Sequence, residues 1–442
     1  MKLQSRRGEI ELLRRQRWLS EEQGSKVTLV LGKRLSGKTA IIAEAYSDRP
    51  FLYLELTGKT EILQMEGYSR QAREKLGIDV PYTINTVRKL IEYLFRISSR
   101  NPMTIVVEDF DEMLRREPGF YEAMKTLWKR ERRTSNVNLV LTMTNPHHAE
   151  KIFYAQGAPL FNMVDTEITL DYMTVAELKQ AMDSSGKPWT NEDLLAMYMV
   201  TGGCPKFVRY ALSKGAVCRT DIIKTFVSSD SPYILEIGCM LMEILGHNSE
   251  VYLSLLQLIA NGTRMLGELE ERLGGIIVGG HLAKLENEYG LLVKTRPVLA
   301  DSRSRNVVRY EIADHMFEFW LRYIETARYM LETGDLDELR GTIDRDFWTH
   351  GRNVLRHFLR KRFAEENGLT EIGGDWKSGK DSVFELDIVG VDKASKTALV
   401  ADVEIDASTF RKDPFLDRVK TLKDGPLRGY TVDARLFTLA DM

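Results

Sequence analysis

The stretch KVTLVLGKRLSGKT, residues 26–39, decides the fold of the first part of this chain. It opens with an apolar, β-branched run at 27–31 that predicts a short buried strand. A glycine-rich turn follows, and the residues from Lys38 to about Tyr46 have the pattern of a helix. A strand, a glycine-rich loop and a helix in this order predict a loop whose backbone N–H groups face a phosphate.

The loop GKRLSGKT, residues 32–39, matches the pattern G-x-x-x-x-G-K-[ST] in full. Its two glycines permit the turn, Lys38 is placed to reach the β- and γ-phosphates, and Thr39 offers its hydroxyl to Mg²⁺. We therefore predict that the chain binds ATP together with Mg²⁺. The residues predicted to bind the nucleotide here are Gly32, Lys33, Arg34, Leu35, Ser36, Gly37, Lys38, Thr39 and Ala40.

A P-loop enzyme also needs carboxylates at the end of a neighbouring strand, to hold Mg²⁺ and to orient the attacking water. The candidates lie in the run TIVVEDFDEM, which starts at Thr104. In one assignment Glu108 serves the metal and Asp109 the water, which inverts the usual order of Asp and Glu. In the other, Asp109 serves the metal and Asp111 or Glu112 serves the water. The predicted metal-site residues are Thr39, Glu108 and Asp109, and the predicted catalytic residues are Glu108 and Asp109.

Composition excludes several classes of protein. The 442 residues exceed one ordinary hydrophobic core and predict several domains. With 62 basic and 64 acidic side chains the net charge is -2, so any contact with DNA must be a local patch. Three cysteines without ligand spacing argue against a disulfide framework and a zinc site. The sequence contains neither a signal-peptide core nor an apolar membrane span, so we expect a cytoplasmic protein with no membrane partner.

The order of elements predicts an α/β fold followed by helical and mixed domains. Strand-like runs alternate with helices up to about Leu170, which predicts a parallel sheet covered on both faces. Beyond it, the segments 174–183, 191–200 and 204–213 have helical patterns, as a lid subdomain would. The predicted domains are a P-loop domain at 1–170, a helical lid at 171–240, a winged helix with a bridging helix at 241–330, and a small α/β domain at 340–442.

The winged helix is predicted from three helical segments and a hairpin between Ser249 and Ala313. Its third helix offers His281, Lys284 and Asn287 beside two glutamates. The hairpin carries Lys294, Arg296, Arg303, Arg305 and Arg309 against Asp301 alone. This modest basic patch suits DNA, whereas the absence of a basic helix suits a partner protein, and both alternatives stay open.

Three further segments combine with the phosphate loop and the acidic strand end. Near the N-terminus, RRGEIELL contains Arg6, Glu9, Ile10 and Leu13; later, TGGCPKFV contains Gly202, Gly203 and Pro205. The segment RYEIADHMFEFW adds Tyr310, Asp314, Phe319 and Trp320. With these motifs the chain resembles, from end to end, the archaeal-type ATPases, a P-loop group related to the AAA+ and STAND proteins. The resemblance implies that Pro205 lies against the nucleotide base, and that the C-terminal domain is of the restriction-endonuclease-like type.

The chain departs from this family where hydrolysis is concerned. The family commonly carries a Gly-Arg pair that acts on the γ-phosphate, and here Asn162 and Met163 occupy the corresponding positions. An arginine finger contributes about 10³ to 10⁵ in rate, so its loss predicts slow turnover. A polar sensor of the γ-phosphate could still come from the strand end LTMTN, with Thr142, Thr144 or Asn145 as candidates.

A nuclease of the restriction-endonuclease-like type would need a carboxylate on one strand, an acid-x-Lys on the next, and a Glu on the preceding helix. Asp387 and Asp402 supply the two strand carboxylates, but Glu404 stands in place of the lysine and Leu355 in place of the helix glutamate. We therefore expect no cleavage. Asp387, Asp402 and Glu404 form a second candidate metal site, and Lys377 or Lys380 could bring a cation from elsewhere.

These observations predict an ATP-binding, slowly hydrolysing molecular switch of the AAA+/STAND-related type. Two other classes stay open: a winged-helix regulator that binds DNA and holds ATP structurally, and a metal-dependent nuclease gated by ATP. The predicted partners are the nucleotide, DNA through the winged helix, and a partner protein.

Overall fold

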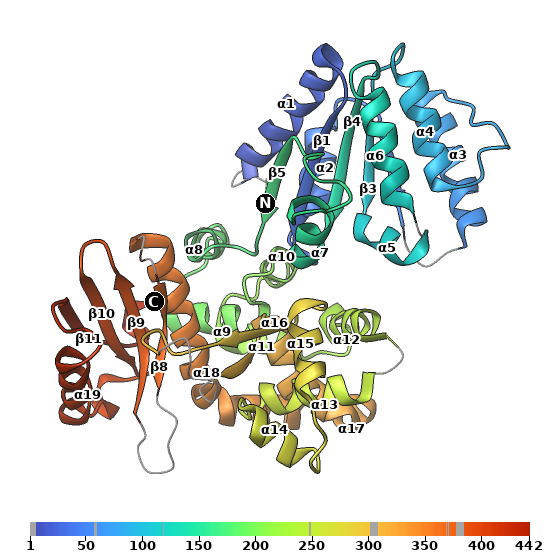
Figure 1. The fold of residues 1–442 in the computed structure, drawn as a ribbon. Coiled ribbons are helices and arrows are strands. Elements are labelled where there is room, and N and C mark those ends of the chain that lie inside the picture. Colours follow the sequence, from blue (N-terminus) through green and yellow to red (C-terminus); the bar gives the residue numbers. More distant parts are fainter. Residues whose placement is uncertain are drawn as a thin grey trace. The chain divides into compact units, whose positions relative to one another are not determined.

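The structure is a computed structural model of the chain, and it describes residues 6–56, 60–117, 119–246, 249–300, 308–367, 369, 371–376 and 384–442. The chain divides into two compact units, with the boundary between Tyr172 and Met173 (Figure 1). In the described ranges, every helix is too short or too polar to cross a lipid bilayer.

The first unit is a parallel five-stranded sheet with helices on both faces. Its strands are β1 (Lys26–Gly32), β2 (Leu52–Glu55), β3 (Met103–Glu108), β4 (Val137–Met143) and β5 (Thr166–Leu170), in the order β2-β3-β4-β1-β5. Its helices are α1 (Arg7–Gln23), α2 (Lys38–Ala45), α3 (Glu61–Leu76), α4 (Val87–Ser98), α5 (Met113–Arg116), α6 (Phe120–Glu131) and α7 (Pro146–Ala149). Two short turns of other helix types are Phe110–Glu112 (3₁₀) and Glu150–Tyr154 (π).

Alternating side chains of β1 face two separate hydrophobic cores. Leu29 and Leu31 join the core beneath α3, α4 and α6, whereas Val30 joins the core beneath α1 and α2. Both faces of the strand are therefore buried, which is why its sequence is a nearly continuous apolar run. The sheet places the carboxyl ends of β1, β3, β4 and β5 along one edge, where the glycine-rich loop begins.

The second unit begins with a helical region. Its helices are α8 (Val175–Asp183), α9 (Asn191–Thr201), α10 (Pro205–Ser213), α11 (Arg219–Phe226) and α12 (Pro232–Leu245). Capping boxes start two of them, Thr174 with Glu177 at α8 and Thr190 with Asp193 at α9. Next come α13 (Ser249–Ala260), α14 (Leu266–Arg272), α15 (Gly279–Asn287) and the antiparallel pair β6 (Leu292–Thr295) and β7 (Arg309–Ile312), the order predicted for a winged helix.

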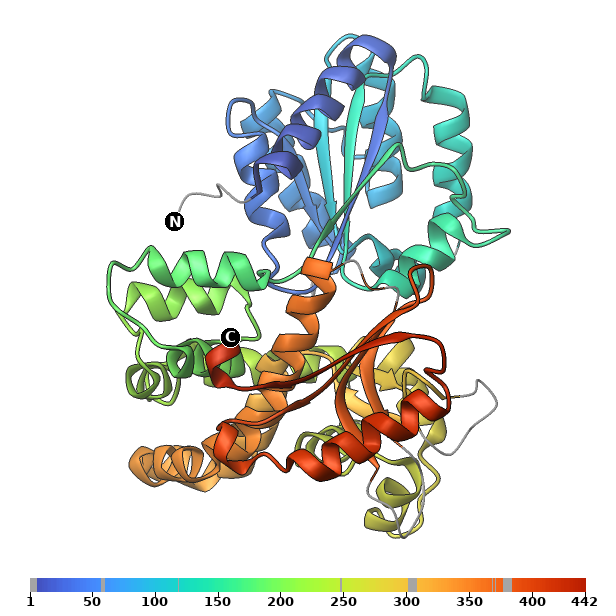
Figure 2. The same cartoon turned by 90° about the vertical axis from the view of Figure 1, so that its left-hand side faces the viewer.

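The C-terminal part of this unit is a mixed four-stranded sheet in the order β11-β10-β9-β8. Its strands are β8 (Glu371–Trp376), β9 (Glu385–Asp392), β10 (Thr397–Val403) and β11 (Thr431–Phe437). The long helix α18 (Leu336–Asn367) precedes the sheet, and α19 (Lys412–Asp424) joins β10 to its parallel neighbour β11. Side chains of α19 such as Phe415 and Val419 pack on Leu386 and Val400 of the sheet, and Figure 2 shows the helix along it.

The predicted α/β fold class, a P-loop-type parallel sheet followed by a helical region and a C-terminal mixed sheet, is confirmed. The single bridging helix expected after the hairpin is instead interrupted. It consists of α16 (His315–Phe319), a π-turn (Trp320–Ile324), a 3₁₀ turn (Glu325–Ala327) and α17 (Arg328–Thr333). The finer domain limits remain predictions.

Candidate functional site

The glycine-rich loop leaves β1 at Gly32 and enters α2 at Lys38. A side chain at Gly32 would place its Cβ 2.5 Å from the Leu170 carbonyl oxygen, so β5 admits only glycine there. Leu35 and Gly37 have positive φ angles of 62° and 100°. A left-handed turn of this kind points successive backbone N–H groups the same way, which is the arrangement that binds phosphate.

Lys38 is a buried cation at the start of α2, with 8% of its surface exposed. Its Nζ donates to the carbonyl oxygens of Gly32 at 2.6 Å and Lys33 at 3.2 Å, and lies 3.4 Å from the Thr144 hydroxyl. Burial lowers the pKa of Lys38 to about 8 despite the nearby carboxylates of Asp109 and Glu108. An anion that reaches the loop would therefore stabilise the charged form of Lys38.

Ser36 supplies a second test of whether the loop fits a phosphate. Its Oγ is buried and has no hydrogen-bond partner in the described part of the chain. A buried hydroxyl without a partner costs free energy that a phosphate oxygen would recover. Thr39 and Ala40 lie in the first turn of α2, where the helix dipole also favours an anion. The loop residues therefore fit the phosphates of a nucleotide, and Thr39 with a strand-end carboxylate would hold Mg²⁺.

The two carboxylates at the end of β3 have different surroundings. Glu108 is the last residue of the strand, and Asp109 follows it in a left-handed conformation with φ of 50°. The Asp109 backbone N–H donates to the Thr142 hydroxyl at 3.2 Å. Burial raises the pKa of Asp109 to about 6, although the charges of Arg34 and Lys38 oppose the rise. The charges of both Asp109 and Glu108 act on Lys38, so both carboxylates lie near the phosphate loop.

Other predicted polar residues at this sheet edge have structural partners. The Asp111 carboxylate lies 2.7 Å from His148 Nδ1, and the Asn145 side chain caps α7 by accepting from the His147 N–H at 2.9 Å. Glu112 lies in the 3₁₀ turn after β3. Of the three candidate sensors, Thr144 has its hydroxyl 3.4 Å from Lys38 Nζ, whereas the Thr142 hydroxyl accepts from the backbone of the acidic turn.

Neither residue at the position expected for the Gly-Arg pair, Asn162 or Met163, has a charged side chain. Asn162 is exposed in a left-handed conformation with φ of 58°. The Met163 side chain is part of the hydrophobic core of the first unit.

Contacts at the end of β5 tie the loop to the last residues of the first unit. Lys33 Nζ lies 3.6 Å from Asp171 Oδ1 and 5.1 Å from the centre of the Tyr172 ring. The Tyr172 hydroxyl donates to the Arg34 carbonyl oxygen at 3.0 Å. Arg6, from the N-terminal motif, donates to the Asp171 carbonyl oxygen at 2.8 Å. Sequence patterns did not indicate Asp171 and Tyr172, because their role depends on β5 lying beside β1.

Tyr53 on β2 was also missed by the sequence reasoning. Burial raises the pKa of the Tyr53 hydroxyl well above the usual value. No motif includes Tyr53. The parallel register of β2 and β3, with Tyr53 opposite Val106 and Glu55 opposite Glu108, brings it to the site.

Pro205 belongs to the second unit, where it is the first residue of α10. The glycines before it have φ of 59° and 80°, and the Gly203 carbonyl accepts from the Met173 N–H at 3.0 Å. The motif is thereby attached to the first residue of its own unit. Contact between Pro205 and a nucleotide base stays a prediction.

In the second candidate metal site, each carboxylate is paired with an arginine. Asp387 accepts from Arg352 at 2.8 Å and lies 3.4 Å from Arg356, both on α18. Glu404 accepts from Arg352 at 3.2 Å, and Asp402 from Arg418. Across the ranges that the structure covers, no group of three or more His, Cys, Asp or Glu side chains could hold a metal ion.

Arginine side chains therefore neutralise the three carboxylates that were predicted to hold a metal ion. Leu355, at the position of the helix glutamate, is fully buried. Lys377 and Lys380 lie outside the described residues.

Part of the predicted basic wing contacts the C-terminal sheet. Arg309 on β7 pairs with Glu385 at 2.8 Å, and its guanidinium lies 4.4 Å from the centre of the Trp376 ring. The Val298 N–H donates to the Gly374 carbonyl at 3.0 Å. Arg303 and Arg305 lie outside the described residues. Lys294, Arg296 and Lys284 are exposed, and His281 packs edge-on against Tyr252.

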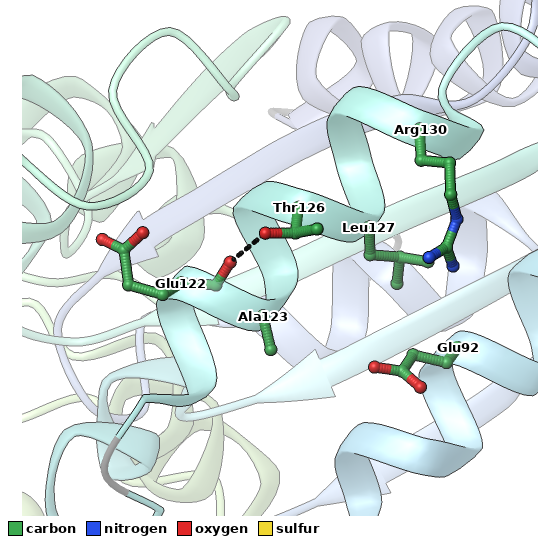
Figure 3. A pocket seen from close by; sticks show the side chains of 6 residues that line it. All are labelled: Glu92, Glu122, Ala123, Thr126, Leu127 and Arg130. Carbon is green, nitrogen blue, oxygen red and sulfur yellow. Dashed lines mark hydrogen bonds between the residues drawn. The ribbon is translucent and has the colours of Figure 1, made fainter.

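A surface hollow of about 300 Å³ lies between α4 and α6 (Figure 3). It is lined by Glu92, Glu122, Ala123, Thr126, Leu127 and Arg130. The Thr126 hydroxyl donates to the Glu122 carbonyl at 2.9 Å, an ordinary bond within a helix. None of the residues predicted to bind nucleotide or metal lines this hollow.

Comparison with solved structures finds several chains of similar fold. A Walker-type ATPase of Pyrococcus abyssi matches with a TM-score of 0.51 and 16% identity, over 72% of this chain and 95% of that one. The ORC2 protein of Aeropyrum pernix, in ADPNP and ADP complexes, gives 0.43 and 16%, over 75% and 95%. Cdc6p from Pyrobaculum aerophilum gives 0.36 and 13%, over 77% and 96%.

The sequence matches no family model, and no curated protein matches it. At these identities the first similarity defines the fold, and the other two are too weak for an inference about this chain. The class is therefore that of a P-loop, Walker-type ATPase fold.

Proposed function

We propose that this chain binds ATP with Mg²⁺ at residues 32–40 and hydrolyses it slowly, as a molecular switch. The buried ammonium of Lys38 carries the proposal, because a cation with 8% exposure and a pKa lowered to about 8 is stabilised when phosphate arrives. The unpartnered Ser36 hydroxyl and the positive φ angles of the loop add support.

Slow turnover is supported by what surrounds the γ-phosphate position. Met163 is buried in the core and Asn162 is uncharged, so neither can act as an arginine finger. Asp109, whose pKa is raised to about 6, and Glu108 are the proposed catalytic carboxylates. A slow hydrolytic step would let the bound nucleotide set the state of the protein for many seconds.

The switch proposal is supported by the contacts of the loop with the end of β5. Lys33 and Arg34 contact Asp171 and Tyr172, and Met173 is the first residue of the second unit. A loop that moves when nucleotide binds would pull on this connection through the covalent chain. A nuclease function is not proposed, because arginines neutralise the carboxylates that it would require.

A protein partner is proposed for the winged-helix segment in preference to DNA. Arg309 is engaged by Glu385, and the turn before α15 exposes Ile276 and Ile277, the latter by 82%. Apolar side chains at the start of a recognition helix suit a protein surface better than base edges. Salt-dependent binding of duplex DNA that is lost when Lys294 and Arg296 are both changed to Glu would overturn this choice.

The experiment that tests the proposed function measures ATP and ADP affinity by calorimetry and steady-state phosphate release, with and without DNA. We expect binding that requires Lys38, slow hydrolysis, and a protease-digestion pattern that differs between the ADP-bound and ATP-bound forms. Lys38→Met should abolish binding, and Tyr172→Phe should bind ATP but lose the difference in digestion. Undiminished ATP affinity in Lys38→Met would refute the assignment of the loop.

A further inference from the structure

Asp109 has a backbone conformation that residues other than glycine seldom adopt. It follows β3 with φ of 50° and ψ of 52°, in the left-handed region. A residue with a Cβ adopts this conformation at a cost in free energy, and the strain persists only where the surrounding structure holds it. Strained residues of this kind cluster at functional sites. The contacts that hold the turn after β3 therefore decide how the Asp109 carboxylate is presented.

Backbone hydrogen bonds hold this turn first. The Asp109 N–H donates to the Thr142 hydroxyl on β4 at 3.2 Å, and the Asp109 carbonyl accepts from the Glu112 N–H at 2.9 Å. The Phe110 carbonyl accepts from the Tyr121 hydroxyl on α6 at 3.1 Å. These bonds fix the peptide groups of the turn from β4 and from α6.

A side-chain hydrogen bond from α7 holds the same turn. His148 Nδ1 lies 2.7 Å from Asp111 Oδ2. A carboxylate only accepts hydrogen bonds, so Nδ1 is the donor. The side chains of Asp111 and His148 are only 14% and 28% exposed, and a hydrogen bond shielded from water is stronger than an exposed one. The His148–Asp111 bond therefore joins the turn after β3 firmly to the helix after β4.

Aromatic packing joins the same two segments at a second point. Phe110 is fully buried, and its ring stacks on that of Phe153, with centroids 5.9 Å apart and an interplanar angle of 21°. Phe153 lies in the π-turn that continues α7. The turn after β3 and the segment 146–154 thus contact each other through both a buried ring pair and a hydrogen bond, so they are expected to move together.

The helix that carries His148 also begins beside the phosphate loop. It follows Thr144, whose hydroxyl lies 3.4 Å from Lys38 Nζ, and the Asn145 side chain caps it. The helix α7 contacts β1, the strand that leads into the loop. His148 lies about one helical turn beyond Thr144. A group that displaces Thr144 therefore displaces the partner of Asp111 as well.

We propose that His148 is a positioning residue for ATP hydrolysis. Through its hydrogen bond to Asp111 it holds the turn in which the strained Asp109 presents its carboxylate to the nucleotide. This inference rests on the proposed function and deepens it, because it gives Asp111 a role that the sequence left open. Asp111 acts on the reaction through the turn, as the partner of His148.

The test compares His148→Ala with His148→Asn in the full chain. The asparagine amide nitrogen is the same number of bonds from the backbone as Nδ1, so it can still donate to Asp111, but it cannot take up a proton. His147→Ala is the matched control, because this neighbour lies on the same helix and its side chain makes no hydrogen bond or ion pair among the residues that the structure describes. For each protein kcat, KM and the affinity for ATP are measured.

We expect His148→Ala to lower kcat roughly tenfold, the factor that one hydrogen bond to a charged group is worth. The affinity for ATP should stay as in the parent, because the phosphate loop is unchanged, and His148→Asn should regain most of kcat. An asparagine variant as slow as His148→Ala would indicate that the imidazole is itself a base, and would overturn the positioning role. So would an unchanged kcat in His148→Ala.

Hydrogen exchange tests the inference without relying on hydrolysis. In the nucleotide-free chain the amides of Asp109 and Glu112 should exchange faster in His148→Ala than in the parent or in His147→Ala. Unchanged exchange would overturn the proposal, whatever the rate of hydrolysis. Failure of the parent to bind ATP would instead overturn the proposed function, and the exchange would still report whether His148 holds the turn. Should His148→Ala melt far below the parent, His148→Leu, which leaves less empty space and has no donor, takes its place.

A double-mutant cycle with Asp109→Asn separates this role from a general loss of activity. Asparagine also tolerates the left-handed conformation, so the substitution changes the charge and leaves the turn in place. If His148 acts through Asp109, adding His148→Ala to Asp109→Asn should lower kcat much less than it does in the parent. Effects that multiply fully would show that the two residues act separately, and would overturn the proposal.

Discussion

Replacing Lys38 by methionine should stabilise the nucleotide-free protein while abolishing its response to ATP. The two side chains have similar length, so Lys38→Met removes the charge without leaving a large cavity. Burial lowers the pKa of Lys38 from its ordinary 10.5 to about 8, which means that the folded protein disfavours the charged form. At about 1.4 kcal/mol per pKa unit, the charge costs roughly 3 kcal/mol of stability at neutral pH.

The net gain in stability is smaller, because methionine removes the lysine donor of the Gly32 carbonyl, whereas the Lys33 carbonyl still accepts from the Ser36 N–H at 3.2 Å. An unsatisfied carbonyl costs about 1–2 kcal/mol, so the free energy of unfolding should rise by about 1–2 kcal/mol. For a unit of this size that corresponds to an increase in Tm of about 2–8 °C. The parent should gain about 2.7 kcal/mol from ATP at one hundred times its Kd, and Lys38→Met should gain nothing.

The pH dependence gives a second check on the same residue. Between about pH 8 and 10.5 the unfolded chain keeps the Lys38 proton that the folded chain has released. The free energy of unfolding of the parent, relative to that of Lys38→Met, should therefore rise with pH across this window. Below about pH 8 the parent carries the full cost of burying the charge.

Differential scanning fluorimetry with and without ATP, at several pH values, measures both effects. Lys89→Met, an exposed lysine on α4, serves as the control and should change neither Tm nor the ATP response. A Lys38→Met protein that melts below the parent at neutral pH, or that still gains stability from ATP, would refute the reasoning.

Three further predictions concern other parts of the chain. Asp387→Ala should destabilise the second unit by about 1–3 kcal/mol in urea unfolding, because it removes a buried partner of Arg352 and Arg356 and leaves them only Glu404 and Glu385; unchanged stability would contradict this. Gly32→Ala should cost about 1–3 kcal/mol and weaken ATP binding measured by calorimetry, because its Cβ would meet the Leu170 carbonyl at 2.5 Å. Burial raises the pKa of the Cys204 thiol to about 12, so a thiol reagent should titrate only the other two of the three cysteines before unfolding. Reaction of all three in the native protein would contradict the burial of Cys204.

Local sequence was sufficient for the elements of the phosphate loop. The strand, the glycine turn and the helix are contiguous, and the chemistry that binds a phosphate is carried by eight successive residues. The alternation of strands and helices likewise predicted the parallel sheet, because apolar runs buried on both faces have a pattern that the sequence shows directly. The helix α3, which holds Tyr53 through Gln71, was not predicted.

The partners of the C-terminal carboxylates Asp387, Asp402 and Glu404 could not be predicted from the sequence. Their spacing matched a metal site closely enough to be proposed, but the sequence could not tell that Arg352 and Arg356 of α18 and Arg418 of α19 would meet them. Those contacts depend on how two helices pack against the sheet. A one-residue rotation along either helix would have removed them.

The sequence by itself predicted which residues would hold the phosphates, because neighbours along the chain make that loop. Only the tertiary structure decided what surrounds them: the burial that lowers the pKa of Lys38, and the hydrogen bond from the Tyr172 hydroxyl to the loop. These features join residues that are far apart in sequence, and they follow from the register of parallel strands. A register is set by the packing of the whole sheet, and no short stretch of the chain contains it.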